Sequence, residues 1–419
     1  MNRKRFFSVL ILAFMLTLLS GALHAQEEIV ITVWTRSETI LSAFEAYNEA
    51  LAEAGSNVRV DYTRVLPEEF PAKFTAALSA GEAPDVVSID LILVPYYNSI
   101  GAFLDLTDRL ADYEYKDELN QAMLNLGTWD GKVYALPFSA DDSALIYNRT
   151  LFEEAGLDPD KPPTTWAELV EYARTLTDPE KGVYGYGFSG GSAGGLMFTM
   201  MPYAWANGGL WLSEDGMTAA VNDPRTVEAV QMFVDMINEG LVPPGTPTYT
   251  YDDFQNGFKQ GQIAMITTGN FVVSDLVRNF PDIDFGVALI PGQDGESFSS
   301  FIGGDLIAIP ATSRYPDEAW EFIKFLLSED VQIEVYAKNG IIPVRRDLHE
   351  NEYFEAEPRY KVFAQALEVG YVPFTVVYNE LYNPFLAGMQ NAFLGNMSVE
   401  EALTQAAAEM QIVIDRAAN

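Results

Sequence analysis

Residues 136–147 read LPFSADDSALIY, and the strand-and-helix pattern of the chain starts afresh within them. Ahead of this stretch, apolar β-branched runs predict buried strands, and apolar residues at three-to-four spacing predict helices. The predicted strands are 29–34, 58–62 and 85–89, and the predicted helices between them are 39–54 and 70–79. Alternation of this kind predicts a mostly parallel sheet with helices on both faces.

After the stretch, the same alternation returns with a strand at 144–147 and helices at 151–155 and 164–176. Further strands are predicted at 263–267, 285–290 and 306–309, and a Gly/Ser-rich stretch, 291–304, separates the last two. The later predicted helices are 224–239, 251–260, 316–327 and 399–416. Two α/β units followed by helices predict an α/β protein of two lobes, with a ligand cleft where the carboxyl ends of the strands meet.

The composition excludes several classes of function. The chain of 419 residues has 60 acidic and 25 basic residues, and its formal net charge of −35 would repel nucleic acid or an anionic lipid surface. It contains no cysteine and only two histidines, His24 and His349. Thiolate nucleophiles, disulfides, iron–sulfur clusters and the common zinc sites therefore lack their usual ligands. We expect no cofactor and no metal, and carboxylates are the abundant acid–base groups that remain.

The first 25 residues have the features of a secretory signal peptide. Arg3, Lys4 and Arg5 precede an apolar run at 6–19, and small residues lead to Ala25. We expect cleavage after Ala25, with Ala22 as the alternative, and an uncleaved amphipathic anchor is the other interpretation. Because no cysteine is present to carry a lipid, the sequence predicts a periplasmic or secreted protein.

Residues 185–191 (GYGFSGG) match the spacing of a dinucleotide-binding glycine motif. The strand before them is short, and the next acidic residue, Glu214, is too distant to bind a ribose. We therefore interpret these glycines as a flexible turn lining the cleft.

Two features near strand ends point to a ligand. Asp141 and Asp142 could be the acid and base of a glycosidase, but neighbours in an extended chain point to opposite sides, which favours hydrogen bonding to a ligand. Trp34 ends the first predicted strand and is followed by a polar loop with Arg36. Because cleft residues come from strand carboxyl ends, Trp34 and Arg36 are candidate ligand contacts.

Several segments resemble one known family. They are 74–90 (FTAALSAGEAPDVVSID), 131–177, 254–270 (FQNGFKQGQIAMITTGN) with 285–292, and 302–347. In this order they resemble the extracellular solute-binding proteins of ABC importers, in the sugar-binding group that includes maltodextrin-binding protein. The resemblance implies a two-lobed periplasmic-binding-protein fold of type II, whose lobes are joined by a hinge of crossing strands and close on one ligand.

The same resemblance implies where the chain passes between the lobes. The expected crossings lie near 139–143, 285–291 and 325–330. Lobe 1 would then comprise 26–140 and 288–326, after the signal peptide at 1–25. Lobe 2 would comprise 141–287 and a helical part, 327–419, that contacts both lobes.

Twelve positions match ligand-binding positions of the family. They are Trp34, Arg36, Asp90, Asp141, Phe198, Asn270, Phe271, Gly303, Gly304, Asp305, Arg345 and Tyr382. The maltodextrin pattern has tryptophan where Phe271 and Tyr382 stand, and residues 91–94 (LILV) replace its polar positions after the third strand. The resemblance therefore does not extend to maltodextrin itself as the ligand.

The sequence thus predicts a monomeric binding protein without catalytic chemistry of its own. It would capture a mono- or oligosaccharide and deliver it to the permease subunits of an ABC importer. One alternative is another polar solute, such as a polyol or glycerol phosphate, although only Arg36, Arg345 and Arg346 are candidates to bind a phosphate. The other is a glycoside hydrolase or lyase that uses two cleft carboxylates, for instance Asp90 and Asp141.

Overall fold

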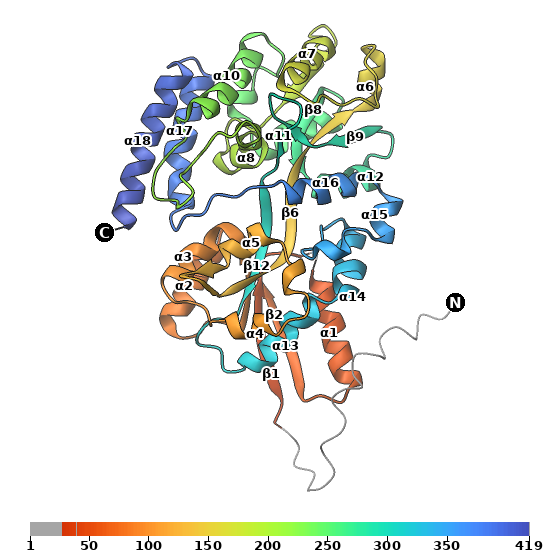
Figure 1. The fold of residues 1–419 in the computed structure, drawn as a ribbon. Helices are drawn as coiled ribbons and strands as arrows, with labels where there is room; N and C mark the ends of the chain where they lie inside the picture. Colours follow the sequence, from red (N-terminus) through yellow and green to blue (C-terminus); the bar gives the residue numbers. More distant parts are fainter. Residues whose placement is uncertain (1–26, 39, 419) are drawn as a thin grey trace.

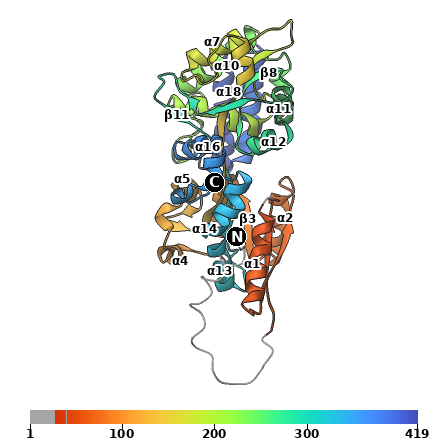
Figure 2. The ribbon, with the colours of Figure 1, turned by 90° about the vertical axis from the view of Figure 1, so that its right-hand side faces the viewer.

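The computed structural model describes residues 27–38 and 40–418, so the expected signal peptide and His24 lie outside the described residues. The described residues form two lobes stacked along one axis, visible in two perpendicular views (Figures 1 and 2). No helix among the described residues is both long and apolar enough to span a membrane.

The lower lobe of Figure 1 contains the first α/β unit. Its strands are β1 (Ile29–Thr35), β2 (Val58–Arg64) and β3 (Val86–Asp90), and β1 pairs in parallel with both others. Its helices are α1 (Leu41–Glu53), α2 (Phe70–Ala80), α3 (Val94–Ser99), α4 (Thr107–Ala111), α5 (Gln121–Leu126), α13 (Pro316–Leu326) and α14 (Glu329–Val331). The predicted strands and helices of this unit are confirmed, with ends that differ by one or two residues.

The upper lobe holds the second unit and most of the later helices. Its strands are β7 (Tyr184–Gly187), β8 (Ile263–Gly269) and β9 (Phe285–Ala288). Its helices are α6 (Arg149–Glu154), α7 (Trp166–Leu176), α8 (Ala193–Thr199), α9 (Met201–Ala206), α10 (Pro224–Asn238), α11 (Tyr251–Lys259), α12 (Phe271–Asn279), α17 (Tyr382–Phe393) and α18 (Val399–Ala417). Two more helices, α15 (Glu352–Ala356) and α16 (Arg359–Glu368), lie near the junction of the lobes (Figure 1).

Two long strands join the lobes, which makes the main sheet mixed rather than mostly parallel. The strand order is β2-β1-β3-β12-β6-β8-β7, and β9 also pairs with β6. Strand β12 (Ile302–Ala308) runs antiparallel to both β3 and β6. The two crossing strands have opposite directions because one carries the chain up from the lower lobe and the other brings it back.

Strand β6 (Ala135–Asn148) is one continuous strand of 14 residues. Its first half pairs with β12, and its second half pairs with β8 and β9. The sequence predicts only 144–147 of it as strand, because Pro137 and the two aspartates interrupt the apolar pattern. Pairing on both edges holds these residues extended despite their composition.

The chain crosses between the lobes later than expected at two of three places. The first crossing, at 139–143, is made by β6. The return is made by β12, whereas β9 stays in the upper lobe, paired to the last residues of β6. Phe325 packs on Tyr47 with ring centroids 4.8 Å apart, and the Leu327 carbonyl accepts a hydrogen bond from Tyr113 in the lower lobe. The Val344 carbonyl oxygen accepts from the Asn120 N–H (2.9 Å) just before α5, so the chain is still in the lower lobe well after the expected crossing at 325–330.

The interpretation of 185–191 as a flexible turn is wrong for Gly185 and Gly187, which lie in a strand, whereas Gly190 and Gly191 do lie in a turn. Gly185 and Gly187 lie within β7, and both are buried. A Cβ on Gly185 would stand 2.0 Å from the Ala173 carbonyl oxygen, and one on Gly190 would stand 2.5 Å from that of Thr246. Only glycine allows these backbones to approach so closely.

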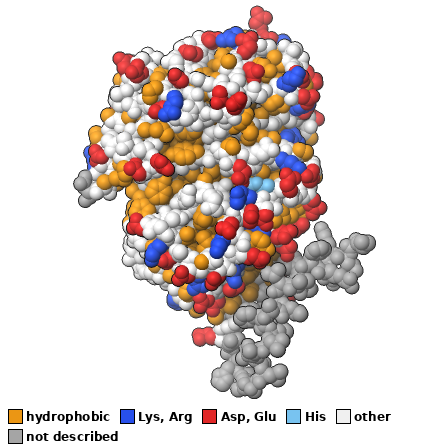
Figure 3. Space-filling model, viewed as in Figure 1, with side chains coloured by type: hydrophobic (Ala, Val, Ile, Leu, Met, Phe, Trp, Pro, Cys, Tyr) orange, Lys and Arg blue, Asp and Glu red, His pale blue; other side chains and the backbone are white. Residues whose placement is uncertain are grey.

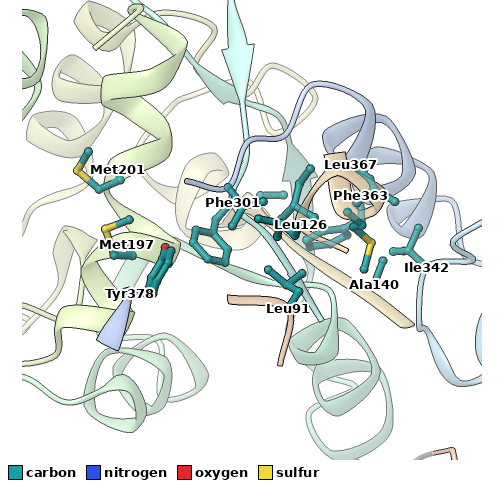
Figure 4. Close-up of a cluster of buried hydrophobic side chains, with 14 of the residues drawn as sticks. Leu91, Leu126, Ala140, Met197, Met201, Phe301, Ile342, Phe363, Leu367 and Tyr378 are labelled. Atoms are coloured by element: carbon teal, nitrogen blue, oxygen red, sulfur yellow. The ribbon is translucent and has the colours of Figure 1, made fainter. Parts of the chain in front are cut away.

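A buried apolar cluster continues from one lobe to the other around the crossing strands (Figure 4). It joins Leu91 and Leu126 of the lower lobe to Met197 and Phe301, and all of these side chains are buried. Helix α16 packs against β6 with its buried side chains, among them Phe363. This shared core surrounds β6 and β12, the strands that carry several residues of the candidate site.

Candidate functional site

Charged residues gather where strands of the lower lobe end. Arg36 follows β1, Asp90 is the last residue of β3, and Asp305 lies beside Asp90 on β12. The Arg36 guanidinium forms ion pairs with Asp90 (3.0 Å) and with Asp305, and it donates to the Gly304 carbonyl oxygen (3.1 Å). The Ser88 hydroxyl donates to the second Asp305 oxygen (3.0 Å). This group therefore forms one closed ionic network.

The energetics of the network follow from burial. Asp305 is 2% exposed, and a buried charge requires a partner of opposite sign. Burial disfavours the charged guanidinium, but the carboxylates of Asp305 and Asp90 outweigh it and raise the pKa of Arg36. Burial also raises the pKa of Asp90, against the opposing effect of Arg36. The Arg36 guanidinium is thus held by partners on β3 and β12.

Asp141 lies on the first crossing strand, at the edge of this network. It stands opposite Gly303 in the pairing of β6 with β12. A Cβ on Gly303 would stand 2.1 Å from the Asp141 carboxylate and 3.3 Å from the Phe198 ring, so the glycine lets both groups approach. Within the described part of the chain, the Asp141 carboxylate has no hydrogen bond or ion pair. Burial raises its pKa to about 7, with Arg36 lowering it and the Asp90 and Asp305 charges raising it.

The upper lobe contributes aromatic rings to the same place. The ring centroid of Phe198, on α8, lies 6.2 Å from that of Phe271 and 6.4 Å from that of Tyr251. Phe271 is the first residue of α12, and Tyr251 is the first residue of α11. Phe271 is 45% exposed, so part of its ring is open to a ligand. Figure 3 shows hydrophobic side chains gathered between the two lobes on a surface otherwise rich in acidic groups.

Two tyrosines of the upper lobe face the carboxylates of the lower one. Burial raises the pKa of Tyr382, at the start of α17, and the Asp90 charge raises it further, which puts the two groups within electrostatic reach. The Tyr378 ring lies 5.6 Å from that of Tyr382. Its hydroxyl is buried and has no hydrogen-bond partner among the described residues.

Sequence reasoning did not single out Tyr251 or Tyr378. Tyr251 could have been found as an aromatic residue at the first position of a predicted helix, directly after the capping residue Thr250. Tyr378 lies in an irregular segment whose position depends on tertiary packing, so the sequence held no comparable signal for it.

Three of the twelve predicted residues do not join the cluster. Trp34 is the next-to-last residue of β1, and its partly buried side chain packs against the core. Asn270 accepts from the Asp142 backbone N–H (3.3 Å) and donates to the Gly340 carbonyl oxygen (2.6 Å). It therefore ties the crossing strand to a neighbouring turn.

The third is Arg345, which is 2% exposed within the lower lobe. Its guanidinium lies 3.5 Å from the Tyr115 ring centroid, is paired with Asp347 (2.5 Å) and donates to the Leu327 carbonyl oxygen (3.2 Å). The Arg345 guanidinium therefore binds groups of the protein itself and does not face the cluster between the lobes. The remaining nine predicted residues are brought together by the fold.

Asp142 lies on the other side of β6 from Asp141, as expected for neighbours in a strand. It is fully buried, and neither carboxylate oxygen has a hydrogen-bond partner among the described residues. Burial raises its pKa well above the usual range, and the neighbouring Asp141 charge adds to the effect. The two aspartates therefore cannot act on one bond as an acid and base pair.

Comparisons with known proteins agree with this architecture. The family model described as bacterial extracellular solute-binding protein matches residues 35–333. The cyclic α-maltosyl-1,6-maltose binding protein from Arthrobacter globiformis is 30% identical, with a TM-score of 0.83 over 93% of this chain and 100% of its own. An ABC transporter solute-binding protein from Thermotoga lettingae, bound with α-D-tagatose, is 27% identical, with a TM-score of 0.79 over 92% and 100%.

A curated relative has a different ligand in its name. It is the sn-glycerol-3-phosphate-binding periplasmic protein of Brucella melitensis biotype 1, 26% identical over 62% of this chain and 61% of its own. These family members and structural neighbours are substrate-binding proteins rather than enzymes, so the glycosidase alternative is set aside. The two-lobed α/β fold is confirmed by the same comparisons. The chain belongs to the bacterial extracellular solute-binding proteins, in the sugar-binding group that serves ABC importers.

Proposed function

We propose that the protein captures a mono- or oligosaccharide outside the inner membrane and delivers it to the permease subunits of an ABC importer. The observation that carries the proposal is the meeting of aromatic rings from the upper lobe with carboxylates from the lower lobe. A sugar presents an apolar face and a rim of hydroxyls, so rings and carboxylates are matched to its two kinds of surface. The Phe198, Tyr251 and Phe271 rings would meet the face, and Asp141 and Asp90 the hydroxyls.

Delivery would follow from closure of the lobes about β6 and β12. A ligand that touches both lobes only when they are closed stabilises the closed form by its extra contacts. We propose that the monomeric protein acts in this way in the periplasm, where the permease would recognise the closed form. The carbohydrate ligands named for the Arthrobacter and Thermotoga structures support both an oligosaccharide and a monosaccharide as candidates.

The second candidate is sn-glycerol 3-phosphate, which the Brucella relative supports. A phosphate ester needs cationic donors that are free to turn toward it. The candidate arginines are engaged: Arg36 and Arg345 as described above, and Arg346 with the Asp117 carbonyl oxygen (2.6 Å) and Glu118 (4.0 Å). Carbohydrate is therefore the better candidate.

A thermal-shift screen of the purified protein tests the proposal. The panel contains neutral mono- and oligosaccharides, polyols and sn-glycerol 3-phosphate. Because a ligand at 100 times its Kd stabilises the folded state by about 2.7 kcal/mol, a bound sugar should raise Tm by several degrees. A rise with sn-glycerol 3-phosphate or a polyol, and with no sugar, would overturn the carbohydrate assignment.

Substitutions in the cluster should weaken sugar binding. Asp141→Ala removes a carboxylate acceptor, and Phe271→Ala removes an exposed ring, so each should raise Kd by about 5- to 150-fold, or about 1–3 kcal/mol. Calorimetric titration with the sugar from the screen measures the change.

Leu394→Ala is the matched control for loss of an exposed apolar side chain. Leu394 is 55% exposed and lies at the other end of α17 from Tyr382. The helix rise puts it roughly 17 Å from that residue. Its Kd should equal that of the parent. If Asp141→Ala and Phe271→Ala also bind like the parent, the site assignment is wrong.

A further inference from the structure

Hydrogen-bond acceptors outnumber free donors in the cluster between the lobes. Asp90, Asp141 and Asp305 supply three carboxylates, which only accept when ionised, against the single guanidinium of Arg36. The N–H groups of Arg36 already point to Asp305, Asp90 and the Gly304 carbonyl oxygen. The cluster thus keeps an excess of negative charge after its only cation has been used.

The excess falls on Asp141. Asp90 and Asp305 form ion pairs with Arg36, whereas Asp141 has no hydrogen bond or ion pair in the described part of the chain and feels the Arg36 charge only from a distance. Its carboxylate faces Gly303 and the Phe198 ring. Its carboxylate is partly withdrawn from water, which also raises its pKa to about 7. A carboxylate in this position gains more from a cationic donor than from a neutral one.

An independent feature adds an unpaired hydroxyl, which can accept a hydrogen bond from a ligand as well as donate one. Tyr378 is 2% exposed, and its hydroxyl is buried and lacks a hydrogen-bond partner among the described residues. Burial raises its pKa, and the Tyr378 ring centroid lies 5.6 Å from that of Tyr382 in the cluster. An unpaired buried polar group costs free energy that a ligand can recover.

We propose that the ligand carries a protonated amine and that Asp141 receives it, with Phe198 beside the cation. This inference rests on the proposed carbohydrate function and narrows the substrate class to amino sugars. An ammonium group offers three donors and no acceptor, whereas a sugar hydroxyl offers one donor and brings acceptors of its own. Aromatic rings near the carboxylate would also attract a cation through their faces.

The same geometry disfavours anionic sugars. A uronate or a sugar phosphate would bring negative charge toward three carboxylates whose only arginine is engaged. A neutral sugar would bind through its hydroxyls but would bring no positive charge to Asp141. The expected order of affinity is therefore amino sugar, neutral sugar, acidic sugar.

Calorimetric titration with matched probes tests the inference. The probes are D-glucosamine and its β-1,4-linked di- and trisaccharides, D-glucose and the corresponding glucose oligomers, D-glucuronate, and spermidine as an amine without a sugar ring. We expect the amino sugar to bind at least about 10-fold more tightly than its neutral counterpart, the scale of a charge-assisted hydrogen bond. Glucuronate should bind more weakly than either.

Two variants locate the effect. Asp141→Asn keeps the shape of the side chain and removes its charge, so the amine preference should fall to about onefold while neutral sugars still bind. Asp142→Asn is the matched control, because that side chain lies on the opposite side of β6 and should leave the preference unchanged. An Asp141→Asn variant that keeps the parent's preference overturns the role of Asp141.

The remaining outcomes separate the two proposals. A neutral sugar that binds as tightly as its amino counterpart, or more so, overturns the inference and leaves carbohydrate binding intact. Binding of spermidine without binding of any sugar overturns the carbohydrate function while amine recognition stands. Failure of both glucosamine probes and spermidine to bind overturns the inference outright.

Discussion

Replacement of Arg36 by methionine is expected to lower the free energy of unfolding by about 3–5 kcal/mol, because it leaves the buried Asp305 carboxylate without a counter-charge. Asp90 and Asp141 would then repel Asp305 in a site partly withdrawn from water. Methionine keeps much of the apolar stem of arginine, so the loss reports mainly on charge. Urea denaturation at neutral pH measures it.

Two further variants sharpen this prediction. Arg59 pairs with Glu28 at the surface, with side chains 48% and 64% exposed, so Arg59→Met should cost less than about 1 kcal/mol. Addition of Asp305→Asn to Arg36→Met removes the uncompensated charge and should restore part of the loss. An Arg36→Met protein as stable as Arg59→Met would show that the ionic network of Arg36, Asp90 and Asp305 does not stabilise the fold.

Replacement of Asp142 by asparagine is expected to make the protein more stable than the parent above about pH 5, by a margin that grows with pH. The pKa of Asp142 is raised well above its usual value in the folded protein and is about 3.9 in an unfolded chain. The folded state therefore holds a proton that the unfolded state releases. Its contribution to stability is complete below about pH 4 and is lost as pH rises toward the folded pKa.

Proton linkage also limits how steeply the free energy of unfolding can change with pH. One proton held only by the folded state changes the free energy of unfolding by about 1.4 kcal/mol per pH unit. The advantage of Asp142→Asn over the parent should thus widen as pH rises from 5 toward the folded pKa of Asp142, as urea denaturation at each pH would show. Asp141 is present in both proteins, so its own titration largely cancels. A constant difference across this range would mean that Asp142 is ionised or paired in the folded protein.

The sequence predicted the alternating elements well and the crossing strands poorly. Apolar periodicity identified β1, α1, β2, α2 and β3, since each of these elements packs on one core. For β6 the pattern failed, because Asp141 and Asp142 are polar residues held extended by neighbours far along the chain. β12 begins at Ile302, inside a stretch whose glycines and serines indicated a loop.

The candidate site was predicted to a similar extent. Arg36 and Asp90 meet because β1 and β3 end at the same edge of the sheet, and the position of Arg36 after the first strand indicated it as a candidate. Asp90 and Asp305, which lies in the middle of β12, were expected from the family resemblance alone. Asn270 and Arg345 have the residue types of a ligand contact, but their hydrogen-bonding groups are used within the framework. Only the folded structure reveals these partners. The Gly340 carbonyl that Asn270 binds is 70 residues away in the chain, and the Leu327 carbonyl that Arg345 binds is 18 residues away.

The claim that the protein holds a carbohydrate between its lobes is tested most directly by calorimetric titration of the parent with sugars and with sn-glycerol 3-phosphate. The account predicts one sugar bound per chain, an affinity that Asp141→Ala and Phe271→Ala both reduce, and no heat of binding with the phosphate ester. Binding of sn-glycerol 3-phosphate with one ligand per chain, together with no binding of any sugar, would contradict it.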